Sequence, residues 1–373
     1  MPATITGREL PVAIIGGGPA GTAAAIELRR CGREAIIFER SRYEGMRIGE
    51  SVPPLARQLL LELGIPEMVL SRNGIACQGV WSAWGSDEVF QKSFIFSPYG
   101  HGWHVDRCNL DKALAEEAES RGTEVLRESK IVSCERTGDG WRITSRNSSR
   151  LETRAASFLI DASGRRSVAG AMLGAPRTTY DHLIGVAQLF CGASDLEPVT
   201  LVEAAENGWW YSAPVPGGAL VVVYLTDADL NPPAGRDAAE RWAYLLAGAR
   251  HTIRRVAGMS PSGPSRTVMA DSYRVACSGD GGWVNAGAAA IGVDPLSSDG
   301  ICLAIRTGRD AGRAVAASLG GDTTAIDSYV NVLDDYFWAY LADRSAFYAA
   351  ESRWSASPFW SRRRSSLPVS SAA

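Results

Sequence analysis

The fold is decided by residues 11–40, which read PVAIIGGGPAGTAAAIELRRCGREAIIFER. The unbroken apolar run at residues 12–15 predicts a short strand that is buried on both faces. Gly16, Gly18 and Gly21 follow with the spacing G-x-G-x-x-G. Glycines at this spacing after a strand allow a tight turn and a close approach of the backbone to a bound group.

A helix and a second strand complete this first unit. Pro19 and Ala20 open the helix, where a proline costs nothing because the first helical N–H groups have no partner within the helix. Residues 34–38 predict the next strand, which ends at Glu39 and Arg40. The helix N-terminus attracts a pyrophosphate and an acid at the end of the second strand binds a ribose diol, so the unit predicts a dinucleotide site.

The composition sets limits on the class of protein. The chain has 373 residues, of which 46% are hydrophobic and 21% charged, and this is typical of a globular protein with one large domain or two lobes. Its net charge of −3 and the lack of a basic stripe give no reason to expect nucleic-acid binding. The seven cysteines show no paired spacing, so we expect neither disulfides nor a metal site. With no signal peptide or membrane span in the pattern, we expect a cytoplasmic protein that contacts no membrane.

Periodicity assigns the rest of the chain to helices and strands. Helices are predicted over about 55–63, after Asn109 as N-cap, over 237–248, after Gly300, and over 324–352. Strands are predicted within 77–106, over 124–135, 141–145 and 158–161, and in several runs between 183 and 226. We interpret residues 258–265, which are rich in Ser, Gly and Pro, as a linker, and residues 137–140 as a hairpin turn.

Three later segments carry a resemblance to a known family. They are WHVDR at 103–107, DASGR at 161–165, and NAGAAAIGVDPLSSDGI at 285–301. Together with the first unit, they resemble the glutathione-reductase-type FAD fold of aromatic monooxygenases and flavin-dependent halogenases. The resemblance covers most of the chain, and its four motifs occur in the order that the family has.

The resemblance implies an α/β fold, in which a Rossmann-like FAD domain carries an inserted mixed β-sheet substrate domain and C-terminal helices. We place the discontinuous FAD domain at 1–76, 105–180 and 276–322, the substrate domain at 77–104 and 181–275, a helical segment at 323–364, and a disordered tail at 365–373.

The same resemblance implies which residues hold FAD. They are Gly16, Gly18, Pro19, Ala20, Gly21, Glu39, Arg40, Arg47, Ser51, Arg107, Ile131, Asp161, Gly287, Asp294, Pro295, Ser298, Gly300 and Ile301. In the family, the loop corresponding to 295–300 lies against the isoalloxazine ring, and the helix after it can stabilise negative charge on the reduced flavin. One departure is Ala288, where the family has an Asp that bonds the ribityl chain. We therefore expect FAD to be bound less tightly than usual.

Within the family, four segments resemble the halogenase-related flavoproteins. They are GESVPP at 49–54, GWWYSAPVPGG at 208–218, DPLSSDGI at 294–301, and the stretch 347–364. This subgroup includes maturases that oxygenate peptide-bound tryptophan to make tryptophylquinone cofactors. Halogenases carry W-x-W-x-I-P. Here residues 209–214 read WWYSAP, which gives W-x-Y-x-A-P.

Halogenases also need a lysine that faces the flavin tunnel. The expected strand near residues 79–85 is preceded by Cys77 and Gln78, and none of Lys92, Lys112 and Lys130 has a matching sequence context. Halogenation is therefore disfavoured.

The resemblance implies a monooxygenase in which O2 adds to reduced FAD at C4a and the resulting hydroperoxide hydroxylates an electron-rich aromatic ring. We expect this ring to be a tryptophan side chain in a peptide or protein. No second nucleotide fingerprint occurs in the sequence, so the electrons are expected from NAD(P)H that binds transiently, from a separate flavin reductase, or from the substrate itself.

Six residues are candidates for catalysis or substrate binding. Glu50 and Asp299 flank the expected flavin face, as a general base or as an acceptor for an indole N–H. The alternative for Glu50 is that it caps or pairs locally, for example with Arg47. His104 is a candidate substrate contact, with a structural role as the alternative. Trp209, Trp210 and Tyr211 can stack on an aromatic substrate, although strand alternation allows only some of them to face it.

Other functions stay open at this point. One is a flavin-dependent halogenase or a hydroxylase of a small indole or phenol. Another is a protein that binds flavin weakly and escorts a precursor peptide without turnover, which Ala288 favours.

Overall fold

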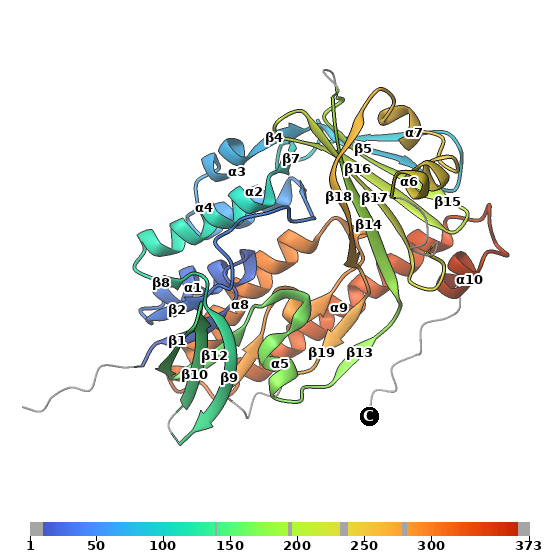
Figure 1. The fold of residues 1–373 in the computed structure, drawn as a ribbon. Helices are drawn as coiled ribbons and strands as arrows, with labels where there is room; N and C mark the ends of the chain where they lie inside the picture. Colours follow the sequence, from blue (N-terminus) through green and yellow to red (C-terminus); the bar gives the residue numbers. More distant parts are fainter. Residues whose placement is uncertain (1–9, 139, 193–195, 232–237, 278–281, 365–373) are drawn as a thin grey trace, which may run out of the picture.

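The computed structural model describes residues 10–138, 140–192, 196–231, 238–277 and 282–364 (Figure 1). Its first layer is a five-stranded parallel sheet in the order β20-β12-β1-β2-β8. These strands are β20 (Trp283–Asn285), β12 (Phe158–Asp161), β1 (Val12–Ile15), β2 (Ala35–Phe38) and β8 (Glu124–Leu126). All four residues of the central strand β1 are buried, which confirms the predicted strand.

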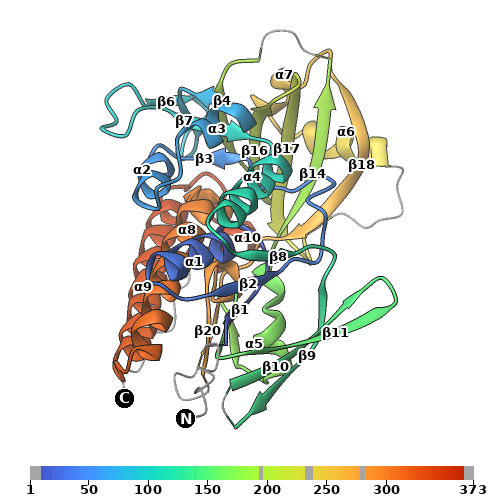
Figure 2. The same cartoon turned by 90° about the vertical axis from the view of Figure 1, so that its left-hand side faces the viewer.

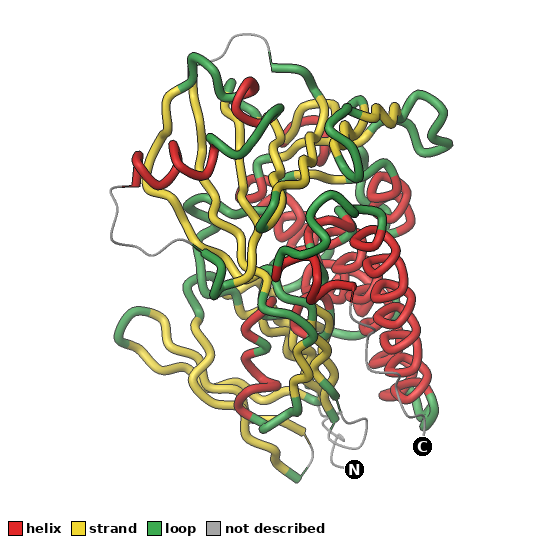
Figure 3. The backbone as a smooth tube through the Cα atoms, turned by 90° about the vertical axis from the view of Figure 1, so that its right-hand side faces the viewer, coloured by secondary structure: helices red, strands yellow, loops and turns green. Residues whose placement is uncertain are grey.

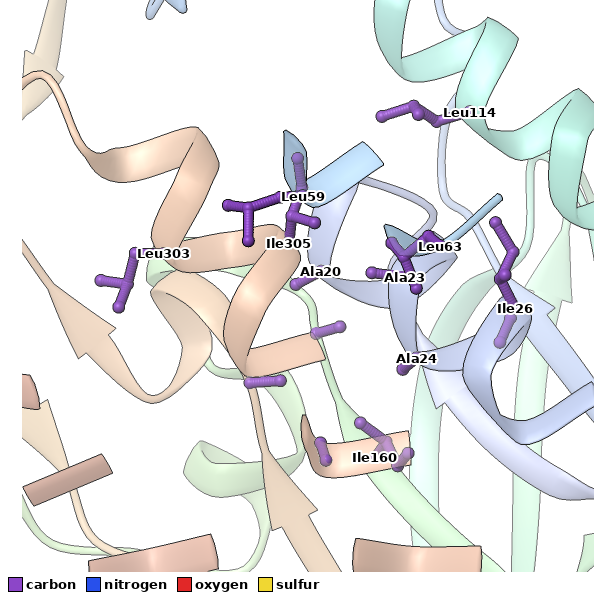
Figure 4. Packing of buried hydrophobic residues seen from close by; sticks show 14 of the residues in the cluster. Ala20, Ala23, Ala24, Ile26, Leu59, Leu63, Leu114, Ile160, Leu303 and Ile305 are labelled. Carbon is purple, nitrogen blue, oxygen red and sulfur yellow. The ribbon is translucent and has the colours of Figure 1, made fainter. Parts of the chain in front are cut away.

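Helix α1 (Pro19–Arg30) packs against helix α8 (Gly300–Leu319) at very short range. A Cβ atom on Gly308 would lie 2.1 Å from the carbonyl oxygen of Ala20, and one on Gly312 would lie 2.6 Å from that of Ala24. Only glycine permits such backbone contact, one turn apart on the same helix face. Figure 4 shows the surrounding apolar side chains, which come from α1, α8, strand β12, α4 (Arg107–Ser120), and α2 (Leu55–Glu62) with the residue after it. This contact fixes the N-terminus of α8 relative to the first unit.

The second layer is a seven-stranded mixed sheet in the order β18-β14-β17-β16-β15-β5-β6. Its strands are β18 (Ser260–Met269), β14 (Leu183–Cys191), β17 (Ala219–Asp227), β16 (Gly208–Val215), β15 (Val199–Ala205), β5 (Gly79–Ala83) and β6 (Phe90–Ser93). Only the β15–β5 pair is parallel among the pairs described. All seven strands fall inside the ranges predicted for the substrate domain.

Helices cover the two faces of this sheet differently (Figures 1 and 3). One face packs against α6 (Ala238–Leu246) through Trp210 and Trp242. The other face, which carries Trp209 and Tyr211, packs against residues from the C-terminal helices α9 (Ala325–Ala349) and α10 (Pro358–Arg364). We call this second face the inner face.

Three small sheets and the remaining helices complete the fold (Figure 2). The sheets are β3 (Ser51–Val52) with β7 (Gly102–Val105) and β4 (Gly74–Cys77); β9 (Lys130–Thr137) with β10 (Gly140–Asn147) and β11 (Arg150–Ala156); and β13 (Arg177–Thr179) with β19 (Tyr273–Val275) and β21 (Ile291–Gly292). The short helices are α3 (Met68–Asn73), α5 (Val168–Met172) and α7 (Thr252–Arg255). The β9–β10 connection confirms the predicted hairpin.

Two local predictions are wrong. The expected linker at 258–265 lies mostly in strand β18, which pairs with β14 at the edge of the sheet. An edge strand tolerates prolines because the N–H groups on its open side have no ladder partner. The N-cap of α4 is Asp106 rather than Asn109, since the Asp106 carboxylate accepts from the backbone N–H of Cys108 and Asn109.

The C-terminal helices hold the layers together. Arg344 of α9 donates to Asp181 at 2.9 Å, and Tyr348 donates to Asp294 at 2.7 Å. Phe359 and Trp360 of α10 are fully buried against the inner face. The tail predicted at 365–373 lies outside the described residues. Within the described ranges, no helix combines the length and apolar character needed to cross a membrane.

Candidate active site

The glycine turn after β1 leaves an open approach to the backbone. A Cβ on Gly16, whose φ is +104°, would lie 2.4 Å from the oxygen of Ala162, and one on Gly21 would lie 1.9 Å from the oxygen of Gly16. A Cβ on Gly18 would meet nothing within 4 Å, and Gly18 is the N-cap of α1 without a side-chain cap. The absence of a side chain at Gly16 and Gly21 therefore allows neighbouring backbone segments to pack closely. The absence of a side chain at Gly18 instead exposes the helix N-terminus to an anionic group.

A cavity of about 410 Å³ opens beside this turn. Its apolar walls include Phe38, Ile131, Val168 and Met172, and its rim carries the basic side chains Arg40, Lys130 and Arg166 together with Glu39. The sequence-based expectation included Ile131, Glu39 and Arg40. Apolar walls with a few polar groups are typical of sites for flat ring systems.

Glu39 keeps one acceptor position free. Its Oε2 accepts from Gly17 N–H at 2.9 Å, and its Oε1 accepts from the N–H and hydroxyl of Ser41 at 2.9 and 2.5 Å. A carboxylate offers about four lone-pair positions, so one remains for a ribose hydroxyl.

Two arginines donate hydrogen bonds to one buried carboxylate, that of Asp111. Arg47 donates to Asp111 at 2.6 Å, and Arg107 donates to the same side chain at 3.2 Å. Arg107 also donates to the carbonyl oxygens of Ile48 and Gly49, which fixes the loop that leads to Glu50. Arg47 pairs with Asp111 and not with Glu50, whereas Glu50 does make a local bond, because its Oε2 accepts from Gly49 N–H.

Asp161 has its carboxylate turned into the protein. It accepts from Ser163 N–H and from Gly170 N–H, both at 3.0 Å. Burial raises the pKa of Asp161 above its ordinary value. It therefore supports the turn from β12 rather than offering a free oxygen.

The loop at 294–300 is braced from inside. Asp294 accepts from Leu296 N–H at 2.9 Å and from the hydroxyl of Tyr348, and burial raises its pKa. Ser298 has φ +51°, and a Cβ on Gly300 would meet nothing within 4 Å. The N-terminus of α8 is thus open to a ligand in the same way as that of α1. Asp299 occupies its N-cap position without capping it, and burial raises its pKa.

The remaining predicted FAD residues lie around these two openings. Pro19 and Ala20 form the first turn of α1, Pro295 begins the braced loop, Ile301 lies in the first turn of α8, and Gly287 packs against Ala20. Ser51 instead directs its hydroxyl toward the seven-stranded sheet, where it bonds Thr200 and Tyr211.

Two of the predicted catalytic residues are buried. Glu50 is 2% exposed, its Oε2 accepts from Gly49 N–H at 2.9 Å, and its Oε1 has no hydrogen-bond partner among the described residues. Burial raises the pKa of Glu50. His104 is fully buried, lies 2.9 Å from the hydroxyl of Thr200, and has its pKa lowered to about 3 by burial. His104 is therefore neutral, and both its Nδ1 and Oε1 of Glu50 are covered by protein atoms in this structure.

The two tryptophans predicted as substrate contacts are core residues. Trp209 is fully buried on the inner face, where its indole N–H donates to Tyr348 at 3.0 Å. Trp210 is fully buried on the opposite face against Tyr224 and Trp242. Strand alternation places the two tryptophans on opposite faces, and the helices that cover each face bury both. The expectation that either ring stacks on a substrate is therefore corrected. Tyr211 faces the same side as Trp209 and keeps a slight exposure of 8%.

Sequence reasoning missed a set of apolar side chains that stay partly exposed. All pack against the inner-face cluster that contains Tyr211, and they are Met46, Ile48, Val80, Leu189, Val215 and Leu296. They come from the loop before Glu50, from the sheet and from the 294–300 loop. No local pattern joins single apolar residues so far apart in sequence. These partly exposed side chains are the apolar groups at the inner-face cluster that are available to contact an aromatic ring.

Lys92 also has a position that its sequence context did not indicate. It pairs directly with Val80 across β6 and β5, so both side chains start from the same face of the sheet. Val80 packs against the inner-face cluster. Lys92 itself is exposed on the edge strand β6.

Comparison with known proteins gives the family. Residues 9–342 match the family model described as an FAD binding domain, so the chain belongs to this family. The putative FAD-dependent oxidoreductase LodB of Marinomonas mediterranea is 29% identical over 94% of this chain and 95% of its own length. A 1H-pyrrole-2-carbonyl-[peptidyl-carrier protein] chlorinase of Pseudomonas fluorescens is 30% identical over 45% of this chain and 42% of its own.

Two solved structures are similar over nearly the whole chain. The flavin-dependent halogenase CmlS has a TM-score of 0.85 and 27% identity, over 97% of this chain and 68% of that one. The peptidyl tryptophan dihydroxylase QhpG, essential for tryptophylquinone cofactor biogenesis, has a TM-score of 0.78 and 22% identity, over 98% of this chain and 80% of that one. The protein is thus an FAD-dependent oxidoreductase of the halogenase-like fold.

The site fits this cofactor. The open turn at Gly18, the free acceptor on Glu39, the neighbouring cavity and the open N-terminus of α8 suit a pyrophosphate, a ribose, an adenine and a flavin ring. In the described part of the chain, no group of three or more His, Cys, Asp or Glu is placed to hold a metal ion.

Proposed function

We propose that the protein is an FAD-dependent monooxygenase that hydroxylates the indole ring of a tryptophan side chain in a peptide or protein. The observation that carries this proposal is the unpartnered Oε1 of buried Glu50, next to a loop whose apolar residues Met46 and Ile48 remain partly exposed. An indole needs both an apolar surface and one acceptor for its N–H. The fold of a peptidyl tryptophan dihydroxylase supports the same reaction class.

The cofactor would be held by the residues predicted for it. The turn at Gly18 and the N-terminus of α1 would receive the pyrophosphate, Glu39 the ribose, and the cavity at Ile131 the adenine. The 294–300 loop and the N-terminus of α8 would face the ring system. Reduced FAD, when bound, supplies the activated oxygen that an aromatic ring attacks.

The chain itself would orient the substrate and exclude water. The partly exposed apolar residues cover one side of the indole, and Glu50 Oε1 accepts its N–H and takes its proton as the ring becomes electron-deficient. The raised pKa of Glu50 brings this carboxyl closer to neutral pH, where proton exchange is most effective. Electrons would come from a separate flavin reductase or from NAD(P)H.

The test uses a candidate precursor protein encoded beside this one. The precursor is incubated with the protein, FAD, a flavin reductase, NADH and O2, and is then analysed by mass spectrometry. A gain of about 16 Da on a tryptophan per oxygen is expected. Glu50→Gln should lower the rate at least tenfold because it removes the proton acceptor and keeps the shape. A halogen mass in the presence of chloride or bromide, or an unchanged precursor, contradicts the proposal and favours halogenation or escort.

A further inference from the structure

A continuous chain of buried and partly buried hydrogen bonds connects His104 with the neighbourhood of Glu50. Nε2 of His104 lies 2.9 Å from the hydroxyl of Thr200, which lies 2.9 Å from the hydroxyl of Ser51, which lies 2.7 Å from the phenol oxygen of Tyr211. The residues come from β7, β15, β3 and β16 in turn, so the hydrogen bonds alternate between the small sheet and the seven-stranded sheet.

The far ends of this chain are two orphan atoms. Nδ1 of His104 and Oε1 of Glu50 are both buried without a hydrogen-bond partner among the described residues. The phenol of Tyr211 lies beside Glu50: burial first, and then the Glu50 carboxylate, raise the pKa of Tyr211 well above its ordinary value. An unpaired buried polar atom is costly, so its surroundings should reduce that cost.

The number of protons on these side chains restricts the direction in which the hydrogen bonds from His104 to Tyr211 are donated. His104 is neutral and carries one ring proton, and each hydroxyl carries one. If Nε2 carries the ring proton, it donates to Thr200, Thr200 donates to Ser51, and Ser51 donates to Tyr211. The phenol proton of Tyr211 is then left over for Glu50. If every hydrogen bond runs in the opposite direction, the ring proton lies on Nδ1, which is then a buried donor without an acceptor. The phenol proton of Tyr211 then points to Ser51, and Glu50 Oε1 receives no hydrogen bond.

We propose that His104, Thr200 and Ser51 are positioning residues that orient the Tyr211 hydroxyl as a donor to Glu50, and that this fixes the carboxylate oxygen that receives the substrate's N–H. The inference rests on the proposed function for the role of Glu50. The direction of the hydrogen bonds, however, is a property of the protein itself. It also gives Ser51 and His104 a task other than direct contact with FAD or substrate.

The first experiment determines the direction of the hydrogen bonds from the tautomer of His104, and it requires no catalytic turnover. Nitrogen-15 NMR of the histidine rings in the FAD-loaded protein, assigned with His104→Gln, should show His104 as the neutral Nε2–H tautomer from pH 5.5 to 8. The Thr200→Val variant removes the acceptor of Nε2–H and should shift this signal, whereas Tyr211→Phe should leave the tautomer unchanged. An Nδ1–H tautomer, or a His104 that titrates in this range, overturns the proposal.

The second experiment reads the effect on Glu50 through the pH profile of kcat/KM for the precursor protein. Removing a donor to a carboxylate disfavours its charged form, so Tyr211→Phe should raise the acidic apparent pKa by about half a unit to one unit. The other charged or titratable groups that face these residues are unchanged in the variant. They are Arg107 beside Glu50, Cys77 beside Thr200, and Arg255 beside His104 and Tyr211.

A matched control separates positioning from general weakening. Thr226→Val removes a buried hydroxyl of the same sheet that donates to Asn207 O at 2.6 Å, and it should leave the apparent pKa in place. If Tyr211→Phe lowers kcat/KM equally at all pH values and leaves the acidic apparent pKa in place, the positioning role is overturned. If no substrate is hydroxylated at all, the proposed function fails, and the tautomer of His104 still decides whether the chain has the inferred direction.

Discussion

Ala288 lies in a short 3-10 turn at Gly287–Ala289, and its side chain is only partly buried. An Asp at this position adds an acceptor for a polar cofactor group without entering the core. Ala288→Asp should therefore tighten FAD binding by about 1 kcal/mol, or about fivefold in Kd. Quenching of flavin fluorescence on titration measures this, and an unchanged Kd would show that the residue faces away from FAD.

Lys92 shares a sheet face with Val80, and it provides a test of the halogenase alternative. In a hydroxylase, Lys92→Ala should leave the yield of oxygenated precursor within about twofold, because an exposed lysine on an edge strand makes no buried contact. Lys112→Ala on the exposed side of α4 is the control. A loss of product in Lys92→Ala alone, together with halide dependence, would contradict hydroxylation.

The close contact between α1 and α8 carries a prediction at the level of these two helices. Gly308→Ala places a methyl group 2.1 Å from the carbonyl oxygen of Ala20, so the helices must separate. We expect a loss of about 1–3 kcal/mol in the free energy of unfolding, together with weaker FAD binding, because both helix N-termini shift. Urea unfolding and the Kd for FAD are the measurements.

Gly248→Ala is the control for that change, since a Cβ there would meet only the oxygen of Leu245 at 3.6 Å. Equal stability in both variants would show that the two helices adjust without cost.

The elements that sequence analysis predicted correctly are those whose pattern is local. The β1–α1–β2 unit and strands β14 to β17 have continuous apolar runs bounded by glycines or polar turns. Strand β18 was missed because prolines and serines at an edge resemble a linker. The α4 cap was misplaced by three residues because Asp106 and Asn109 are equally good capping residues.

The site was predictable only where a motif defines it. The spacing of the first motif predicts Gly18 and Glu39, and the family resemblance predicts the 294–300 loop. The bond between Ser51 and Thr200 joins residues 149 positions apart, and that between Ser51 and Tyr211 joins residues 160 positions apart. A single hydroxyl has no periodic signal, so tertiary structure alone reveals this chain.

The whole molecule depends on its last described helix. Arg363 of α10 pairs with buried Asp227 at 2.6 Å, and Phe359 and Trp360 are fully buried against the inner face. Ending the chain after residue 357 removes these groups and leaves Asp227 without either arginine partner. We expect the truncated protein to lose at least about 3 kcal/mol in the free energy of unfolding.

Ending the chain after residue 364 is the control for the truncation, because it keeps α10. Chemical denaturation of both proteins compares them directly. Equal midpoints would show that α10 is dispensable for the fold.

The interleaving of the two large sheets has a consequence for synthesis. Strand β20, which completes the parallel sheet, begins at residue 283. Strand β5 has only the edge strand β6 as a sheet neighbour until β15, which begins at residue 199, has been synthesised. A ribosome releases the chain from its N-terminus, so the glycine turn leaves the exit tunnel long before α8 can cover α1. During this interval the nascent chain exposes apolar strands, and chaperone supply should therefore limit the yield of protein obtained from a foreign host.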